Sequence, residues 1–480
     1  MEYDKDLRSR QEARQLVNQA EAAFQTLRRF DQARLDRIVQ AVSEAGSRHA
    51  AELGRMAVQE TGFGNPEDKE IKNRFAAETV YGAIRDMKTV GILREDRERR
   101  VWDVGVPVGV IAGIVPSTNP TSTVIYKALI ALKAGSPIVF SPHPKAVGCT
   151  VKTAALLEQA ARSAGAPEGS IGCISVPTME AVQELMHHEH TKLILATGGA
   201  AMVRAAYSSG KPAIGVGAGN GPAYIHRSAN IPQAVAHILR SNTFDNGTVC
   251  ASEQSIIAEE CCADKIREEF RRQGAYFLNP QEAGAIAKLL LRSDGSINPQ
   301  VVGKTAVEVA KLAGLTVPAG TRVLIARETE AGPTRPYSRE KLCPVLAFFV
   351  ERDEDAILRR SVEVLLQEGA GHTYAIHATD EAVIRRFALE VPVSRFLVNT
   401  PASLGGVGLT TGLFPALTLG CGAVGGSSSS NNIGPLDLIN LRRVAWGTSE
   451  EISGPEPDKA LVESLTQEIL RRLNNENFRR

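Results

Sequence analysis

The sequence predicts an α/β protein with two domains, each built on a mostly parallel sheet, followed by a small β element and a C-terminal helix. Between Val108 and Ala196, short apolar runs alternate with helical stretches, and the alternation restarts after Pro222. Strands separated by helices of this length imply right-handed crossovers and a parallel sheet. The chain of 480 residues is also too long for one ordinary core. We therefore expect two domains whose ligands gather at the carboxyl ends of the strands.

The first hundred residues are expected to form helices that cover a sheet. Apolar residues recur there at helical spacing with Arg and Glu between them, as at Leu16, Ala20, Ala23 and Leu27. The expected strands of the first sheet are 108–115, 137–140, 171–176 and 193–196, with helices at 121–134, 147–164 and 179–187. The second set has strands near 223–225, 255, 321–326, 345–350 and 374–377, and a helix near 231–239.

Changes in composition set the expected boundaries. The first domain is assigned to residues 1–224, the second to 225–425, a return segment with a strand to 426–447, and a linker with an amphipathic helix to 448–480. The region 405–432 is rich in Gly and Ser, which usually indicates a disordered linker. Because an ordered-looking segment follows it, we expect a loop that folds over a site.

Charge and cysteine usage exclude several classes of partner. The net charge of +1 gives no electrostatic reason to expect nucleic acid or an anionic membrane. No apolar run approaches the roughly 18 residues of a membrane span, and the charged N-terminus lacks the apolar region of a signal peptide. The seven cysteines are scattered without CxxC spacing, so we expect a reduced, intracellular compartment and no metal site.

One cysteine stands where a reactive group could be presented. In SNTFDNGTVCASEQ, Cys250 follows a turn of small residues and precedes an apolar, strand-like run. Reactive groups are often carried at such loop ends. Free cysteine is also among the most buried residue types, so this stretch alone is equally compatible with a core thiol.

Three loops that follow strands carry groups suited to a dinucleotide or a thioester. They are PSTNPTS, FSPHP and LATGGAA, and their candidate residues are Asn119, Ser141, His143, Thr197, Gly198 and Gly199. Helix N-termini after such turns offer free backbone N–H groups. The usual GxGxxG fingerprint is absent, because Gly217, Gly219 and Gly221 are too closely spaced. A nicotinamide cofactor would therefore need a non-standard form of the binding fold.

Several motifs in order carry a family resemblance: IVPSTNPTS, IVFSPHPKA, ATGGAAMVRAA, GVGAGNGPAYI, FDNGTVCASEQS, EKLCPVLAF, GHTYAIH and SSSSNNIGP. From about residue 10 to 447 the sequence resembles the aldehyde dehydrogenase superfamily, specifically its coenzyme-A-acylating branch of acetaldehyde and propionaldehyde dehydrogenases. The resemblance implies two Rossmann-type α/β domains and a small β oligomerisation element. That element would comprise a hairpin at 96–106 and a strand at 438–444, and would join a homodimer or homotetramer.

The resemblance also implies roles for individual residues. Cys250 would be the nucleophile that forms an acyl thioester, and Asn119 would donate to the oxyanion together with the backbone N–H of Cys250. Typical hydrolytic members carry this asparagine one position earlier, where this chain has Thr118. His372 would contact the substrate or assist deprotonation of coenzyme A, although a lone histidine is equally often structural.

The same resemblance implies a cofactor site. Glu340 would hold the nicotinamide ribose, and Gly217 would also contact the cofactor. Thr197, Gly198 and Gly199 would lie under the pyrophosphate. Ser141 and His143 would contact the adenosine part of NAD or coenzyme A. No arginine stands beside FSPHP to bind a 2′-phosphate, which favours NAD over NADP.

The most informative departure from the hydrolytic relatives is at Val216. Those relatives carry a general-base glutamate at this position, and an alkyl side chain cannot accept a proton from water. Coenzyme A is therefore the expected acyl acceptor, and the expected reaction converts a short aldehyde, coenzyme A and NAD⁺ to acyl-coenzyme A and NADH. Propionaldehyde is slightly preferred over acetaldehyde. A hydrolytic aldehyde dehydrogenase and a non-catalytic assembly protein of the same fold remain alternatives.

The C-terminal segment carries a single apolar stripe, formed by Val462, Leu465, Ile469 and Leu473. So short a helix is marginal alone and needs a partner surface. It resembles the targeting helices of enzymes enclosed in bacterial microcompartments. Residues 460–473 would then contact the shell, and the enzyme would lie in the bacterial cytoplasm inside such a compartment. Docking on its own protomer is the alternative.

Overall fold

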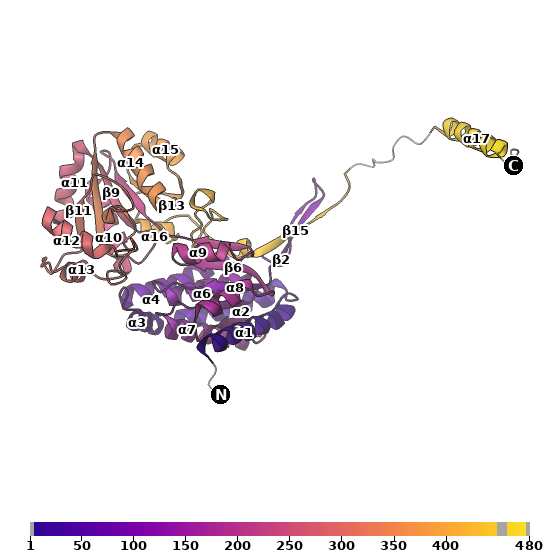
Figure 1. Cartoon of the computed structure of the whole chain (residues 1–480), viewed down its shortest axis with the longest axis horizontal. Helices are drawn as coiled ribbons and strands as arrows, with labels where there is room; N and C mark the ends of the chain where they lie inside the picture. The colour runs from indigo at the N-terminus through magenta and orange to yellow at the C-terminus, as the bar shows by residue number, and fades with distance from the viewer. Residues whose placement is uncertain (1–3, 449–457, 477–480) are drawn as a thin grey trace. The chain divides into compact units, whose positions relative to one another are not determined.

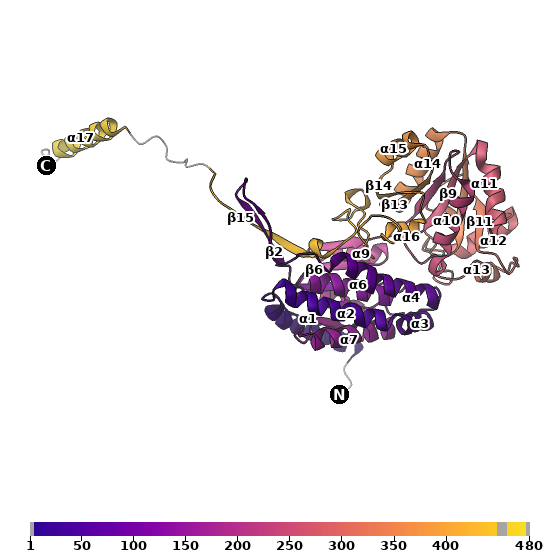
Figure 2. The ribbon, with the colours of Figure 1, turned by 180° about the vertical axis from the view of Figure 1, so that it is seen from behind.

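The computed structural model describes residues 4–448 and 458–476. Two compact units are present: Met1–Val90 with Val106–Asn440, and Gly91–Gly105 with Leu441–Arg480. The first unit holds two parallel sheets with their helices, and Figures 1 and 2 show it from opposite sides. The predicted α/β architecture is confirmed.

The first sheet is parallel and has the strand order β5-β4-β3-β6-β7. Its strands are β3 (Val110–Ile114), β4 (Ile138–Ser141), β5 (Ile171–Cys173), β6 (Thr191–Thr197) and β7 (Ala213–Val216). These are short, nearly continuous apolar runs, as strands covered on both faces require. The sheet ends at Val216, and the next strand of the chain belongs to the second sheet and begins at Gly221, close to the expected boundary at 225.

Helices cover both faces of this sheet. Those in contact with its strands are α1 (Lys5–Leu27), α6 (Pro120–Lys133), α7 (Val147–Ser163), α8 (Met179–His187) and α9 (Ala200–Tyr207). Packed on these helices and on one another are α2 (Gln32–Arg48), α3 (Ala50–Thr61), α4 (Pro66–Arg74), the π-helical η1 (Phe75–Thr79) and α5 (Val80–Ile84). Every residue of α6 is buried, so this helix forms the centre of the first domain. Helix α4 begins with Asn65, whose side chain accepts a hydrogen bond from the backbone N–H of Asp68, and with Pro66 at the first turn.

The second sheet is also parallel, with the order β10-β11-β12-β9-β8-β13-β14. Its strands are β8 (Gly221–Ile225), β9 (Glu253–Glu259), β10 (Ala275–Phe277), β11 (Val323–Arg327), β12 (Val345–Glu351), β13 (Gly371–His377) and β14 (Val393–Val398). The accompanying helices are α10 (Ile231–Thr243), α11 (Glu260–Arg272), α12 (Pro280–Leu290), α13 (Ala306–Leu312), α14 (Glu354–Gln367), α15 (Glu381–Glu390) and α16 (Ala402–Gly406). Short 3₁₀ turns are η2 (Phe244–Gly247), η3 (Pro336–Ser338), η4 (Ala423–Gly425) and η5 (Pro435–Leu438).

A three-stranded sheet has the order β1-β2-β15. Strands β1 (Gly91–Asp96) and β2 (Val101–Pro107) form an antiparallel hairpin that begins earlier than the expected 96–106, and β15 (Ile439–Ala445) matches the expected strand at 438–444. Within this unit the rings of Trp102 and Trp446 meet edge to face with centroids 4.7 Å apart. The expected linker after residue 448 lies outside the described residues, and helix α17 (Lys459–Glu476) follows it.

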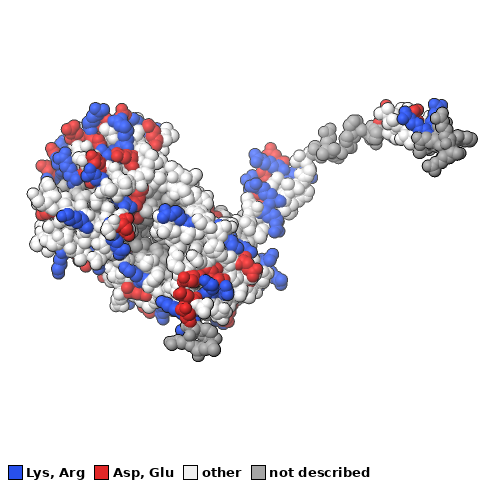
Figure 3. Space-filling view, viewed as in Figure 1, with Lys and Arg blue, Asp and Glu red and all other residues white. Residues whose placement is uncertain are grey.

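The surface of the molecule carries charges of both signs. On the face seen in Figure 3, Lys and Arg side chains are interspersed with Asp and Glu, and uncharged surface lies between them. This distribution agrees with the net charge of +1.

Candidate active site

A cavity of about 600 Å³ lies in the first unit and is lined by residues from both α/β domains. The predicted site residues that line it are Asn119, His143, Thr197, Gly198, Gly199, Gly217, Cys250 and Glu340. Val216 lines it as well. Residues far apart in the sequence therefore share one cavity, as the order of the motifs led us to expect.

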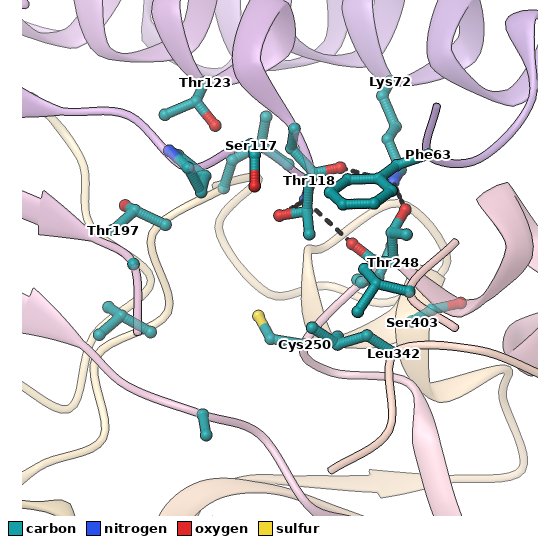
Figure 4. Close-up of a pocket in the computed structure, with 18 of the residues that line it drawn as sticks. Phe63, Lys72, Ser117, Thr118, Thr123, Thr197, Thr248, Cys250, Leu342 and Ser403 are labelled. Carbon is teal, nitrogen blue, oxygen red and sulfur yellow. Dashed lines mark hydrogen bonds between the residues drawn. The ribbon is translucent and has the colours of Figure 1, made fainter. Parts of the chain in front are cut away.

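Cys250 is presented from the turn between helix α10 and strand β9. Asp245 and Asn246 adopt left-handed backbone angles, with φ of 48° and 51°, and Gly247 follows at 78°. Such angles are costly for residues other than glycine and persist only where surrounding contacts impose them. Figure 4 shows the sulfur of Cys250 directed into the open part of the cavity, with Thr197 on one side and Thr118 and Thr248 on the other.

The thiol of Cys250 is protonated in this state. Burial raises its pKa to about 12, the charge of Glu340 adds to the shift, and Arg395 opposes it. The thiolate is the nucleophilic form of cysteine, so the thiol must lose its proton when a carbonyl arrives.

Glu340 lies against the backbone beside Cys250. Its Oε1 accepts the backbone N–H of Gly219 at 2.9 Å, and its own backbone N–H donates to Oε2 of Glu368 at 2.9 Å. Burial raises the pKa of Glu340 to about 8. The carboxyl group is thus fixed in place and changes charge near neutral pH.

Asn119 precedes helix α6 as its N-cap, yet its side chain makes no capping hydrogen bond. Its Oδ1 instead accepts from Nζ of Lys72 at 2.6 Å, and its Nδ2 donates to the carbonyl oxygen of Thr248 at 3.0 Å. The same Nδ2 also donates to Oγ1 of Thr118 at 3.2 Å. The amide is therefore connected to the loop that carries Cys250.

The end of strand β6 fits a dinucleotide. Thr197 Oγ1 is buried and has no hydrogen-bond partner in the part of the chain that the structure describes. A Cβ added at Gly199 or Gly217 would meet no atom within 4 Å, so the backbone at both positions is open to the cavity. Helix α9 begins directly after Gly199, and its N-terminal N–H groups suit a pyrophosphate.

Two predicted residues do not appear among the described residues that line the cavity, Ser141 and His372. Ser141 ends strand β4 and is 2% exposed. The Nδ1 of His372 shares a hydrogen bond of 2.9 Å with Oγ1 of Thr373, and burial lowers the pKa of His372 to about 3. This histidine is neutral and a weak base, and its role stays a prediction.

The sequence did not single out the buried charges beside Asn119. Lys69 and Lys72 on helix α4 both bond to Oδ2 of Asp245, whose side chain is completely buried. Lys72 also lines the cavity. The one available signal was a pair of lysines three residues apart, separated by Asn73 and Arg74 from the apolar residues Phe75, Ala76 and Ala77.

The described residues offer neither a cluster of metal-ligating side chains nor a membrane-spanning helix. They contain no group of three or more His, Cys, Asp or Glu side chains arranged to hold a metal ion. None of their helices is long and apolar enough to cross a bilayer.

Comparison with known proteins matches residues 5–281 to the aldehyde dehydrogenase family. The chain is 44% identical over 435 residues to the bifunctional aldehyde-alcohol dehydrogenase AdhE of Escherichia coli, covering 90% of this chain and 49% of that protein. The chain thus spans about half the length of the first curated relatives that it matches.

Solved structures extend the comparison over nearly the whole chain. A probable aldehyde dehydrogenase from Listeria monocytogenes is 57% identical, with a TM-score of 0.92 over 93% of this chain and 99% of that one. An acetylating aldehyde dehydrogenase from Geobacillus thermoglucosidasius is 49% identical, with a TM-score of 0.93 over 94% and 100%. A propionaldehyde dehydrogenase from a fucose-utilisation microcompartment of Clostridium phytofermentans is 27% identical, with a TM-score of 0.83 over 92% and 98%.

Proposed function

This chain belongs to the aldehyde dehydrogenase family, and we propose that it converts a short aldehyde, coenzyme A and NAD⁺ to acyl-coenzyme A, NADH and a proton. The observation that carries the proposal is Val216, which is buried at the end of strand β7 and lines the same cavity as Cys250. An alkyl group there cannot activate water against an acyl-enzyme.

Acylation begins at Cys250. Its thiol proton passes to solvent and its sulfur attacks the aldehyde carbon, which gives a thiohemiacetal with negative charge on the former carbonyl oxygen. An N–H of Asn119 and the backbone N–H of Cys250 would stabilise that oxygen. Loss of one such donor typically costs about 10²-fold to 10³-fold in kcat.

The cofactor would be held by Thr197, Gly198 and Gly199 at its pyrophosphate and by Glu340 at its nicotinamide ribose. When bound, NAD⁺ supplies the acceptor for the hydride that leaves the substrate carbon. The chain's part is to hold the thiohemiacetal carbon on Cys250 in position and to exclude water. His143 and Gly217 line the same cavity and would contact the adenosine part and the backbone side of the cofactor.

Deacylation requires a nucleophile stronger than unactivated water. The thiolate of coenzyme A attacks the thioester carbon, the C–S bond to Cys250 breaks, and the Cys250 thiolate leaves. One thioester is exchanged for another, so the energy of the oxidation is retained in acyl-coenzyme A.

The test is a coupled assay with and without coenzyme A, in which NADH and the acyl product are both measured. We expect sustained NADH formation only with coenzyme A, and acyl-coenzyme A in equal amount. Equal turnover without coenzyme A, with free acid as product, would overturn the proposal.

Hydrolysis is the second candidate, and one observation favours it. Glu340 lines the cavity and its pKa of about 8 is suited to a general base near neutral pH. If Glu340 activated water, Glu340→Gln would abolish acid formation and leave the first acylation intact. The assay above separates the two candidates.

Propionaldehyde or acetaldehyde is the proposed substrate, with NAD⁺ preferred over NADP⁺. Support comes from apolar side chains such as Phe75, Phe244 and Leu419 in the cavity lining. The acetylating and propionaldehyde dehydrogenases that the chain resembles point to the same substrate class. Relative kcat/KM values across aldehydes of two to four carbons would settle the order.

Assembly and location extend the proposal. The sheet formed by β1, β2 and β15 would join two or four copies, and Leu441 and Trp446, 48% and 41% exposed, would be covered there. Helix α17 would direct the enzyme, in a bacterial cytoplasm, to a microcompartment shell. Its apolar residues Leu461, Val462, Leu465, Ile469 and Leu470 are 44% to 57% exposed, and such a stripe marks an interaction surface. The side chain of Leu473 lies outside the described set.

A further inference from the structure

The ammonium group of Lys72 has three hydrogen-bond acceptors around it. They are Oδ2 of Asp245, Oδ1 of Asn119 at 2.6 Å and Oγ1 of Thr248 at 3.2 Å. Three acceptors match the three N–H bonds of an ammonium, so its donors are fully used. Lys72 is 5% exposed, and its Nζ also lies 5.5 Å from the centroid of the Phe244 ring. The side chain therefore has a defined position in the cavity wall.

Asp245 fixes this position from the opposite side. Its Oδ1 accepts the backbone N–H of Asn65 at 3.0 Å, and its Oδ2 accepts from Lys69 at 2.5 Å and from the Thr248 hydroxyl at 2.7 Å. A Cβ on Gly64 would lie 1.7 Å from Oδ1 of Asp245, so only glycine leaves room for the carboxylate. Buried charges are tolerated where they are paired and hydrogen-bonded in this way.

Lys72 determines the orientation of the Asn119 amide. The Lys72 ammonium can only donate, so the amide oxygen of Asn119 must face it. The Thr248 carbonyl can only accept, so the amide nitrogen must face Thr248. One N–H of Asn119 is used by Thr248, two residues before Cys250. Nδ2 also lies 3.2 Å from Oγ1 of Thr118, so an oxyanion in the cavity would accept from this amide in place of Thr118. Figure 4 shows Lys72 reaching from its helix toward Thr118 and Thr248.

We propose that Lys72 is a positioning residue for this reaction: it holds the amide oxygen of Asn119 so that the amide N–H is directed at the oxyanion formed on the carbon bonded to Cys250. The inference rests on the proposed function, because Asn119 must be the oxyanion donor. It explains why an asparagine at a helix N-cap makes no cap, since Lys72 and Thr248 occupy both ends of its amide. It also links helix α4 to the chemistry.

Lys69 provides a matched control. It lies one helical turn before Lys72, is equally buried, and bonds to the same oxygen of Asp245, but its remaining hydrogen bond is to the backbone carbonyl of Thr118 at 2.7 Å. Lys69→Met and Lys72→Met each remove one of two cations from one carboxylate. They differ in that Lys72 also donates to Oδ1 of Asn119 and to Oγ1 of Thr248, whereas Lys69 donates to the Thr118 carbonyl.

The experiment is a double-mutant cycle read as the burst of NADH in a single turnover, with melting temperatures measured for every variant. We expect Lys72→Met to lower the acylation rate about tenfold or more with little change in aldehyde KM, since misplacement of a catalytic group by about 1 Å can cost 10²-fold. Lys69→Met should change the acylation rate by less than about threefold. In an Asn119→Ala background, Lys72→Met should cause no further loss, because the two residues act as one unit.

Alkylation of Cys250 by iodoacetamide should be unchanged in Lys72→Met, since this reaction develops no oxyanion. Equal losses in the two lysine variants, multiplicative losses in the double variant, or slowed alkylation would each overturn the inference and assign Lys72 to holding the fold. If Lys72→Met does not fold, Lys72→Gln takes its place in the same cycle, because its amide can still donate to Asp245.

The burst does not depend on coenzyme A. If the wild-type protein forms no acyl-coenzyme A, the proposed function is refuted, and the double-mutant cycle can still be measured from the NADH burst. If the wild-type protein forms acyl-coenzyme A but the double-mutant cycle does not give the expected rates, only the role of Lys72 is refuted.

Discussion

The α-carbon of Gly219 lies so close to the carbonyl group of Cys250 that a Cβ at Gly219 would stand 1.8 Å from the Cys250 oxygen. The same glycine donates its N–H to Glu340. One backbone position therefore touches the proposed nucleophile and the proposed ribose ligand.

Gly219→Ala should lower kcat about 10²-fold or more, because the Cys250 loop must move to accommodate the methyl group. The measurement is single-turnover acylation together with the melting temperature. Gly284→Ala in helix α12 is the control, since its Cβ would meet no atom within 4 Å. That control should be neutral or stabilising by about 0.5–1 kcal/mol. Normal acylation in Gly219→Ala would show that the loop adapts freely.

Val216→Glu should create turnover in the absence of coenzyme A, because a carboxylate at the end of β7 can accept a proton from water. Free acid is the product to measure. Val216→Gln has a similar shape without the basic group and should stay dependent on coenzyme A. If glutamate and glutamine behave alike, Val216 does not decide the acyl acceptor.

Alkylation of Cys250 in the free enzyme should still be accelerating at pH 10, since the pKa of the thiol is raised to about 12. Above pH 8 the Glu340 carboxyl is ionised and opposes loss of the thiol proton. Glu340→Gln should therefore react faster than wild type above pH 8 and equally below it. An alkylation rate that reaches a plateau near pH 8 in Glu340→Gln would contradict this account.

The raised pKa of Glu340 also makes the free energy of unfolding depend on pH. Between its ordinary value of 4.5 and about 8, the folded state keeps a proton that the unfolded state has lost, so Glu340 makes the free energy of unfolding fall as pH rises through this window. Glu340→Gln should flatten that fall. Urea unfolding at pH 5, 7 and 9 measures it, and parallel curves for the two proteins would exclude the effect.

Asp245→Asn should cost about 3–5 kcal/mol of unfolding free energy, because it leaves Lys69 and Lys72 buried without their carboxylate. Chemical denaturation is the measurement. Asp86→Asn, whose side chain is 85% exposed, should change stability by less than about 0.5 kcal/mol. Equal effects of the two substitutions would mean that the buried lysines lose their charge instead.

Removal of apolar surface from α17 should separate location from catalysis. Leu465→Glu with Ile469→Glu is expected to abolish association with a microcompartment shell and to leave kcat and KM unchanged. Co-sedimentation with shell particles is the measurement, and Glu463→Lys on the same helix serves as the control. Loss of activity in the double variant would instead show that the helix docks on its own protomer.

Much of the fold could be predicted because apolar runs and helical spacing are local signals. The strands β3, β4, β6 and β12 and the helices α6, α7 and α8 lie within a few residues of their expected ranges. Strand β7 was not foreseen, because Ala213–Val216 is four residues long and merges into a glycine-rich turn. Strand β14 was missed as well, since its run contains Ser394 and Arg395.

The site could be predicted only in part. Motif order pointed to Cys250, Glu340 and the Thr197 turn, which line one cavity, and their roles stay predictions. The pairing of Lys72 with Asp245 spans 173 residues and leaves no periodic trace. Two lysines on a short helix are usually solvated, and only the fold reveals that these are buried against a carboxylate.

Helix α6 has no side-chain cap at its N-terminus, and at Asn119 the stability of the helix competes with the proposed catalytic role. An N-cap side chain contributes about 0.5–2 kcal/mol to its helix, and Asn119 forgoes that contribution by turning to Lys72 and Thr248. Serine at this position could cap the helix and could not replace the amide. Selection of this protein for heat tolerance alone would therefore favour Asn119→Ser and yield a more stable chain without its proposed oxyanion donor.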